Sequence, residues 1–215
     1  KFLYWITKHK KLKSIDEMLA EKKLLKIRKR NEYFVSPSFS TISAFGANAS
    51  VPHYRVSRKT NVKFSKDSLY LVDSGGQYFD GTTDITRTIA LGKPTNEQKD
   101  RFTRVLKGHI ALSTVIFSRK TKGSDLDYLA RKFLKKINCD YDHGTGHGIG
   151  SFLSVHEGPQ RISKLPRKYD CFLKNGMILS NEPGYYKKNE YGIRIENLII
   201  VNKLKNNKLK FETIS

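Results

Sequence analysis

Cysteine is scarce in this sequence, which has only Cys139 and Cys171 among its 215 residues. Two cysteines are too few for a disulfide-stabilised scaffold or a cysteine-rich zinc module. Long apolar runs are also lacking, because no stretch approaches the ~18 residues that a transmembrane helix needs. We therefore expect no membrane span, and we take both cysteines as core residues of a protein located in the cytoplasm.

Negative charge is scarce as well: 20 Asp and Glu residues stand against 41 Lys and Arg, which gives a net charge of +21. A strongly basic surface could attract nucleic acid or other acidic partners. The basic residues are spread along the whole chain, however, and no signature of a nucleic-acid-binding module accompanies them. We therefore interpret the charge as a lysine-rich solvated surface and do not expect nucleic acid as a partner.

The apolar pattern predicts helices combined with mainly antiparallel strands, an α+β fold. Capping boxes at Ser14–Glu17 and Thr95–Gln98 predict two helix starts. Alternating apolar residues around Gly75-Gly76 predict a hairpin over residues 69–90. The predicted helices cover residues 1–35, 95–117 and 124–137, and the other predicted strands cover 39–43, 177–180, 193–201 and, as an edge strand, 209–214.

Two aspartates lie on the predicted hairpin. Asp73 ends its first strand, and Asp84 lies within the returning strand. Neighbouring positions on paired strands can bring two carboxylates within about 5 Å on one face. Two buried carboxylates repel each other, so such a pair needs a cation or a shared proton. Two ordinary surface acids of a hairpin are the alternative interpretation.

A glycine-rich segment with three histidines follows the last predicted helix. Glycine occupies every second position from Gly144 to Gly150, around His143 and His147, and His156 follows shortly afterwards. Such glycines let the backbone approach a ligand closely, and histidines serve as metal ligands or proton shuttles. A phosphate-binding loop is a weaker interpretation, because the Lys and Ser/Thr of the Walker motif and the dinucleotide pattern are absent.

Two further acids lie nearer the C-terminus. Glu182 precedes a Pro-Gly turn, and period-two alternation places Glu196 on one strand face with Arg194. Arg194 could pair with Glu196 or with a metal-binding carboxylate, and a plain surface ion pair is the alternative. With Asp73 and Asp84, the set of four carboxylates and one histidine is too oxygen-rich for structural zinc. It suits two divalent cations, Mn²⁺ first and Co²⁺, Zn²⁺ or Fe²⁺ as alternatives.

Four motifs stand in a fixed order along the chain. They are Asp73-Ser-Gly-Gly-Gln-Tyr-Phe-Asp-Gly-Thr-Thr-Asp84, His143-Gly-Thr-Gly-His147 with Val155-His-Glu-Gly-Pro159, Asn181-Glu-Pro-Gly-Tyr-Tyr186, and Gly192-Ile-Arg-Ile-Glu-Asn197. In wording and spacing they resemble the Xaa-Pro aminopeptidases (aminopeptidase P), over about residues 14–201. The resemblance implies the pita-bread fold, a curved, mainly antiparallel sheet backed by helices. It also implies metal-dependent removal of the N-terminal residue from peptides with proline in second position.

The resemblance implies a division of labour around two metal ions. Asp73 would bind one ion, Asp84 and Glu196 would bridge both, and His147 and Glu182 would complete the second site. A hydroxide bridging the two ions would attack the carbonyl before proline, and Glu182 would also move its proton.

Four more residues receive roles from the same resemblance. His156 would hydrogen-bond the substrate carbonyl or the tetrahedral intermediate. His143 would line the pocket for proline, and His53 would lie near the substrate amine and the scissile bond. Arg194 would hold the metal-binding carboxylates in place.

The resemblance also implies a domain organisation and partners. Residues 1–215 would form a single pita-bread catalytic domain, without the N-terminal domain or domains of the family and without part of its C-terminal extension. A full-length protein would form a homodimer. Two alternatives stay open: a non-catalytic member of the fold that binds RNA, ribosomes or proteins, and a prolidase or other peptidase specificity on the same site.

Overall fold

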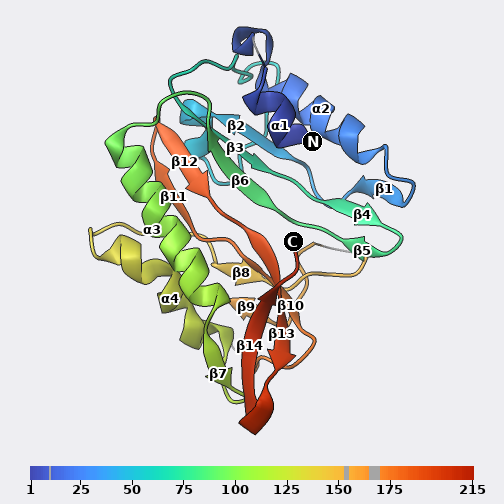
Figure 1. Cartoon of the computed structure of the whole chain (residues 1–215), viewed down its shortest axis with the longest axis vertical. Helices are drawn as coiled ribbons and strands as arrows, with labels where there is room; N and C mark the ends of the chain where they lie inside the picture. Colours follow the sequence, from blue (N-terminus) through green and yellow to red (C-terminus); the bar gives the residue numbers. More distant parts are fainter. Residues whose placement is uncertain (10, 153–154, 165–169) are drawn as a thin grey trace.

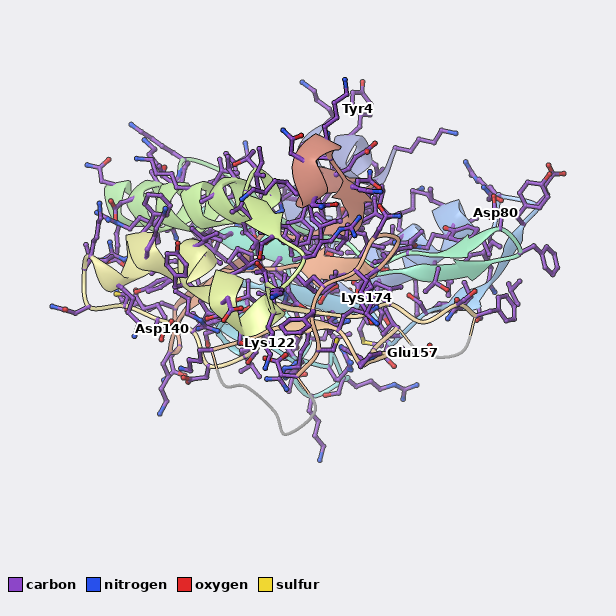
Figure 2. The ribbon with its side chains drawn as sticks, turned by 90° about the horizontal axis from the view of Figure 1, so that it is seen from below. Tyr4, Asp80, Lys122, Asp140, Glu157 and Lys174 are labelled. Carbon is purple, nitrogen blue, oxygen red and sulfur yellow. The ribbon has the colours of Figure 1, made fainter. Side chains whose placement is uncertain are left out.

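The computed structural model describes residues 1–9, 11–152, 155–164 and 170–215. Its helices and antiparallel strands confirm the α+β prediction (Figure 1). The molecule is elongated in the view of Figure 2, with Asp80 at one end and Asp140 towards the other. No helix of the described ranges is long and apolar enough to cross a membrane.

The N-terminal half is built on a three-stranded antiparallel sheet. Strands β2 (Ile42–Phe45) and β6 (Thr86–Ala90) flank β3 (Leu69–Asp73), with Asp73 opposite Thr86. A smaller ladder extends this half and consists of β1 (Phe34–Pro37), β4 (Gly76–Tyr78) and β5 (Gly81–Thr82). Helices α1 (Phe2–Thr7) and α2 (Glu17–Arg28) cover the larger sheet through an apolar core.

The C-terminal half contains a four-stranded antiparallel sheet and two short ladders. The sheet has the order β10 (Ile178–Asn181), β13 (Asn197–Lys203), β14 (Lys208–Thr213) and β7 (Ile116–Ser118). The ladders are β8 (Gly146–His147) with β9 (Arg161–Ile162), and β11 (Gly184–Lys187) with β12 (Tyr191–Arg194). Helices α3 (Asn96–Ser113) and α4 (Gly123–Lys135) pack together along one side (Figure 1).

Strand β12 joins the two halves. Its Arg194 exchanges backbone hydrogen bonds with the hydroxyl of Thr88 on β6, at 3.0 and 3.1 Å. Gly192 is required next to the 3₁₀ helix Gly46–Ser50, because a Cβ there would lie 1.7 Å from the carbonyl oxygen of Ala49. This close approach brings the end of β12 to the edge of the sheet where Asp73 ends β3 and Asp84 precedes β6.

Several predicted boundaries were wrong. Ser14 does not cap a helix: residues 1–35 hold α1, a 3₁₀ turn and α2, and Asp16 caps α2 by accepting from the N–H of Leu19 at 2.7 Å. Thr95–Gln98 does form a capping box, as predicted, but its helix ends at Ser113.

In the C-terminal half, the predicted strand over residues 193–201 is broken after Arg194. The predicted edge strand is β14, which is paired on both sides. The last predicted helix begins at Gly123 rather than after a Ser124 cap. Both cysteines are free and only half-buried.

Candidate active site

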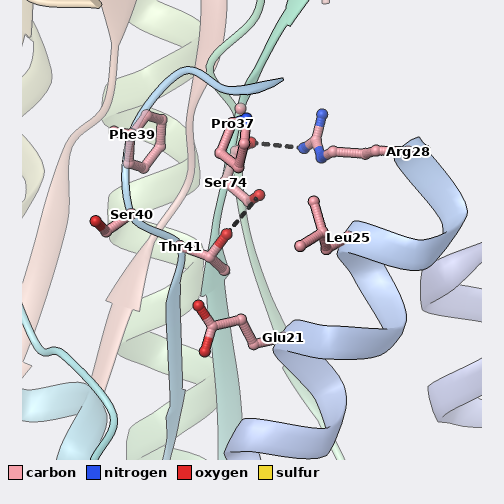
Figure 3. A pocket seen from close by; sticks show the side chains of 9 residues that line it. Glu21, Leu25, Arg28, Pro37, Phe39, Ser40, Thr41 and Ser74 are labelled. Carbon is pink, nitrogen blue, oxygen red and sulfur yellow. Dashed lines mark hydrogen bonds between the residues drawn. The ribbon is translucent and has the colours of Figure 1, made fainter. Parts of the chain in front are cut away.

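Four histidines and one glutamate predicted from the sequence line a single pocket of about 540 Å³. The five residues are His53, His143, His147, His156 and Glu182. Another pocket, of about 420 Å³, lies between α2 and the segment before β2 (Figure 3). None of the predicted site residues lines this second pocket, so the candidate active site is the histidine-lined pocket.

Buried carboxylates lie beside that pocket. Asp84 is 3% exposed and precedes β6, and Glu196 is 1% exposed and lies between β12 and β13. One ligand atom from each of Asp84, His147 and Glu196 lies within 4.8 Å of the other two. Asp73 faces Thr86 rather than Asp84, so the two aspartates are diagonal neighbours, not directly opposite.

A buried arginine holds Asp73. Arg194 donates from Nη2 to Oδ2 of Asp73 at 2.8 Å and from Nη1 to the hydroxyl of Tyr186 at 2.6 Å. Tyr186 can therefore donate its proton to Nε2 of His143, which lies 2.8 Å away. Arg194 was predicted to pair with Glu196 or with a metal-binding carboxylate, and its ion pair is with Asp73, one of the predicted metal ligands. The other oxygen of Asp73, Oδ1, is buried and has no hydrogen-bond partner among the described residues.

The ring of His147 is oriented by the backbone. Nδ1 lies 3.0 Å from the carbonyl oxygen of Gly148, which can only accept, so Nδ1 carries the proton. Nε2 then faces Oε1 of Glu182 at 3.2 Å and Oδ2 of Asp84 at 3.6 Å. Nε2 donates to Glu182, and loss of this proton on metal binding would direct a nitrogen lone pair toward the same carboxylates, as a metal-ligating histidine requires.

Local charge changes the acidity of these groups. Burial alone would raise the pKa of Glu182, but its hydrogen bond to His147 and the nearby positive charges lower the pKa to about 2. Burial alone would lower the pKa of His147, but Glu182 and Asp84 raise the pKa to about 9. A protonated His147 therefore places a positive charge next to Glu182 and Asp84.

The negative charges of Asp84 and Glu196 are not balanced by the positive charge nearby. Burial, followed by the repulsion of neighbouring carboxylates, raises the pKa of both groups well above the ordinary value. Glu196 accepts a hydrogen bond of 2.5 Å from the hydroxyl of Thr86. Buried acids with so little positive charge around them suit a bound cation. The unpaired oxygen Oδ1 of Asp73 is a further atom that could coordinate it. Oxygen donors with one imidazole suit divalent metals such as Mn²⁺, without selecting one of them.

The remaining histidines surround this cluster. The ring of His156 lies 4.1 Å from that of His147, centroid to centroid, and burial lowers the pKa of His156. Burial also lowers the pKa of His143. His53 is exposed at the pocket wall, in the loop that follows the 3₁₀ helix Gly46–Ser50. The structure thus brings together all the residues that were predicted for the site.

Sequence reasoning missed two hydroxyl groups of the site. Thr86 bonds Glu196, and Tyr186 connects Arg194 to His143. Thr86 could have been found, because period-two alternation from Asp84 places it on the same face. Tyr186 belongs to one of the motifs, but nothing in the local pattern indicates that its hydroxyl group would be used.

The sequence matches one protein family over most of its length. The model of metallopeptidase family M24 matches residues 1–203. The chain belongs to metallopeptidase family M24. As expected of this family, its fold is the pita-bread fold.

Individual M24 proteins are similar in sequence and structure. A fungal protein from Podospora anserina, described as "Probable Xaa-Pro aminopeptidase P", is 50% identical over 89% of this chain and 28% of its own length. A counterpart from Sordaria macrospora is 48% identical over 95% of this chain and 34% of its own length. The chain therefore spans about a third of the length of these curated relatives.

Solved structures extend the comparison. X-prolyl aminopeptidase from Caenorhabditis elegans, described as a cytosolic enzyme with a di-nuclear active site, is 40% identical with a TM-score of 0.91. The alignment covers 99% of this chain and 35% of that enzyme. Prolidase from Pyrococcus furiosus is 30% identical with a TM-score of 0.78, over 91% of this chain and 54% of that protein.

Proposed function

We propose that this M24 chain hydrolyses the bond between an N-terminal residue and a following proline, as a dinuclear metallo-aminopeptidase. One observation carries the proposal: a cluster of buried, mutually repelling carboxylates lies against a pocket lined by four histidines. The similarity to Xaa-Pro aminopeptidases supports the substrate class. Proline lacks an N–H and has a restricted backbone, so its peptides suit a specialised peptidase.

Two divalent cations would supply Lewis acidity and a nucleophilic water at neutral pH. Asp73, Asp84, His147, Glu182 and Glu196 would hold them. Arg194 would keep Asp73 oriented through its 2.8 Å ion pair, and Thr86 would do the same for Glu196. We propose Mn²⁺ as the first metal to test, ahead of Co²⁺, Zn²⁺ and Fe²⁺.

The residues around the metals would handle the proton and the substrate. Glu182 would accept the proton of the attacking water, a task that its ionised state permits. His156 would donate a hydrogen bond to the oxygen on which negative charge develops. His143, held by Tyr186, would form the proline side of the pocket, and His53 would contact the N-terminal end of the peptide.

The setting of this activity is also a proposal. We propose that residues 1–215 are one catalytic domain, because β12 packs against elements of both halves. The C. elegans enzyme is cytosolic, which supports a cytoplasmic location. A homodimer of the full-length protein, and the absence of nucleic acid as a partner, stay predictions.

Prolidase activity is the second candidate, and the similarity to the P. furiosus prolidase favours it. A prolidase cleaves Xaa-Pro dipeptides, whereas an aminopeptidase P also accepts longer peptides. The two activities therefore differ in what the pocket allows beyond proline.

Metal content and peptide cleavage test the proposal together. The chain is purified, stripped with EDTA, reloaded with Mn²⁺ and assayed on Xaa-Pro dipeptides and Xaa-Pro-Xaa tripeptides, with Xaa-Ala-Xaa tripeptides as control. We expect about two metal ions per chain. We also expect cleavage of the Xaa-Pro-Xaa tripeptides but not of the Xaa-Ala-Xaa tripeptides. Cleavage of dipeptides only would support a prolidase, and metal loading without any cleavage would contradict the proposal. Salt-dependent RNA binding without metal would favour a non-catalytic module.

A further inference from the structure

One of the buried carboxylates outside the metal cluster lies at the start of α2. The residue is Glu17, which is 0% exposed. Among the described residues no Lys, Arg or His forms an ion pair with it. Its charge is instead surrounded by hydrogen-bond donors, which makes it different from Asp84 and Glu196.

Four groups donate to the Glu17 carboxylate. The N–H of Phe45 donates at 2.7 Å and the N–H of Val62 at 3.1 Å. The amide of Asn48 donates to both oxygens at 3.0 Å, and the hydroxyl of Tyr54 donates at 2.9 Å. Because all four partners are donors, the ionised form, which only accepts, satisfies every one of them.

These donors come from one irregular segment. Between β2 and β3 the chain contains no strand and only the 3₁₀ helix Gly46–Ser50. Phe45 is the last residue of β2, directly before this segment, and Val62 lies beyond the middle of the segment, so the carboxylate ties the segment back to the end of β2. The opposite side of the segment packs on the β11–β12 hairpin: Ala49 lies against Gly192 of β12, and Ser50 accepts from the N–H of Asn189 in the turn before β12 at 3.2 Å.

His53 lies inside the loop that Glu17 closes. It follows Asn48 and directly precedes Tyr54, the two side chains that bond the carboxylate, and it lines the active-site pocket. Exposed at the pocket wall, His53 depends on its backbone for its position. A displacement of about 1 Å is enough to reduce catalysis markedly in a preorganised site.

We propose that Glu17 is a positioning residue of the active site, whose buried carboxylate fixes segment 45–62 and thereby holds His53 at the wall of the pocket. The inference rests on the proposed peptidase function, because His53 acts on a substrate only if the pocket binds one. The proposal gives helix α2 a role in catalysis although it does not contact the substrate.

A double-mutant cycle with His53 tests the proposal. Glu17→Gln keeps the shape of the side chain but turns an NH₂ group toward donors, so kcat/KM of the Mn²⁺-loaded enzyme should fall about 10-fold. In the His53→Ala background the same change should alter kcat/KM less than about 2-fold, because its effect passes through His53. Equal losses in both backgrounds would overturn the proposal.

Ile15→Val is the matched control for lost stability. Ile15 is buried next to α2, and its side chain accepts no hydrogen bond from the loop, so its truncation should lower Tm while leaving kcat/KM unchanged. Metal content should stay at the wild-type level in both Glu17→Gln and Ile15→Val. Loss of metal from Glu17→Gln would contradict a role limited to His53.

A readout without turnover separates this inference from the proposed function. Bound Mn²⁺ broadens the NMR signals of nearby imidazole protons, and His53→Ala identifies the His53 signal. In Glu17→Gln that broadening should change, while Ile15→Val should keep the wild-type pattern. If the wild type shows no peptidase activity but this difference is seen, the proposed function fails and the positioning by Glu17 stands; an unchanged signal overturns the positioning.

Discussion

Glu17 and the cluster of Asp84 and Glu196 are two regions with buried carboxylates, and burial is accommodated there in opposite ways. Glu17 is surrounded by four donors from a single segment. Asp84 and Glu196 lie among other acids; Thr86 donates to Glu196, and Nε2 of His147 lies 3.6 Å from Asp84. Burial raises the pKa in both regions, but hydrogen bonds counteract it at Glu17 whereas like charges add to it at Asp84.

This contrast separates a structural acid from a cation site. A buried carboxylate whose lone pairs meet donors needs nothing further from solution. A group of carboxylates without enough donors remains costly until a cation joins it. Burial alone therefore does not identify a metal site, and the chemistry of the neighbouring groups does.

Removal of one site carboxylate should have the largest effect. Asp84→Asn is expected to lose most of the bound metal and to lower kcat/KM by at least about 10³-fold, because one acid was assigned to both ions. Metal analysis and Xaa-Pro hydrolysis measure the two effects. The metal-free variant should also be at least as stable as the metal-free wild type, since the change relieves repulsion within the cluster.

Glu17→Gln is the control for Asp84→Asn. It removes an equally buried negative charge but should keep both metal ions, and its metal-free form should be less stable than the wild type because donors lose their acceptor. If Asp84→Asn retained full metal and activity, Asp84 would not be a ligand and the contrast would fail.

Within the pocket, a smaller loss is expected when a group is removed that binds substrate rather than metal. His156→Ala should lower kcat by roughly 10²–10³-fold, the usual cost of one oxyanion donor, with little loss of metal. Metal analysis on the same preparation distinguishes this outcome from Asp84→Asn. Release of the metals from His156→Ala would instead mean that His156 is a ligand.

The candidate site residues were found from short motifs in the sequence. The hairpin relates Asp73 to Asp84 and period-two alternation relates Arg194 to Glu196, whereas the proximity of Asp84 to Glu196 comes from the folded chain. The hairpin of residues 69–90 and the Thr95–Gln98 capping box likewise depend on neighbours in sequence. The capping box is present and β3 pairs with the returning strand, but that strand is limited to Thr86–Ala90, so Asp84 precedes it, and residues 76–82 form β4 and β5 instead.

Long-range packing decided the features that were predicted wrongly. Ser14 and Glu17 match a capping box, but the Glu17 side chain turns inward to donors as far away as Val62, and Asp16 takes over the cap. Such an exchange cannot be seen in a local pattern, because its benefit comes from segments that meet only in the folded chain. The hydroxyl of Tyr186 escaped prediction for the same reason.

The smallest expected effect concerns a buried base. This base also shows a third way in which an ionisable group can be buried. His109 on α3 is 8% exposed, and its Nε2 has no hydrogen-bond partner among the described residues. Burial, together with the charge of Arg87, lowers the pKa of His109 to about 4. His109 therefore requires neither donors nor a cation, because it stays neutral.

Stability should then depend on pH through this residue. Between the unfolded pKa of 6.5 and the folded value of about 4, the unfolded chain binds the extra proton, so stability falls as the pH falls through this window. From pH 7 to pH 5 the wild type should lose about 2 kcal/mol more than His109→Gln, which cannot titrate. Urea unfolding with EDTA present measures this difference without a contribution from metal binding. Equal losses in the two proteins would mean that His109 takes up its proton without unfolding, and that burial at this position does not keep an unpaired base neutral.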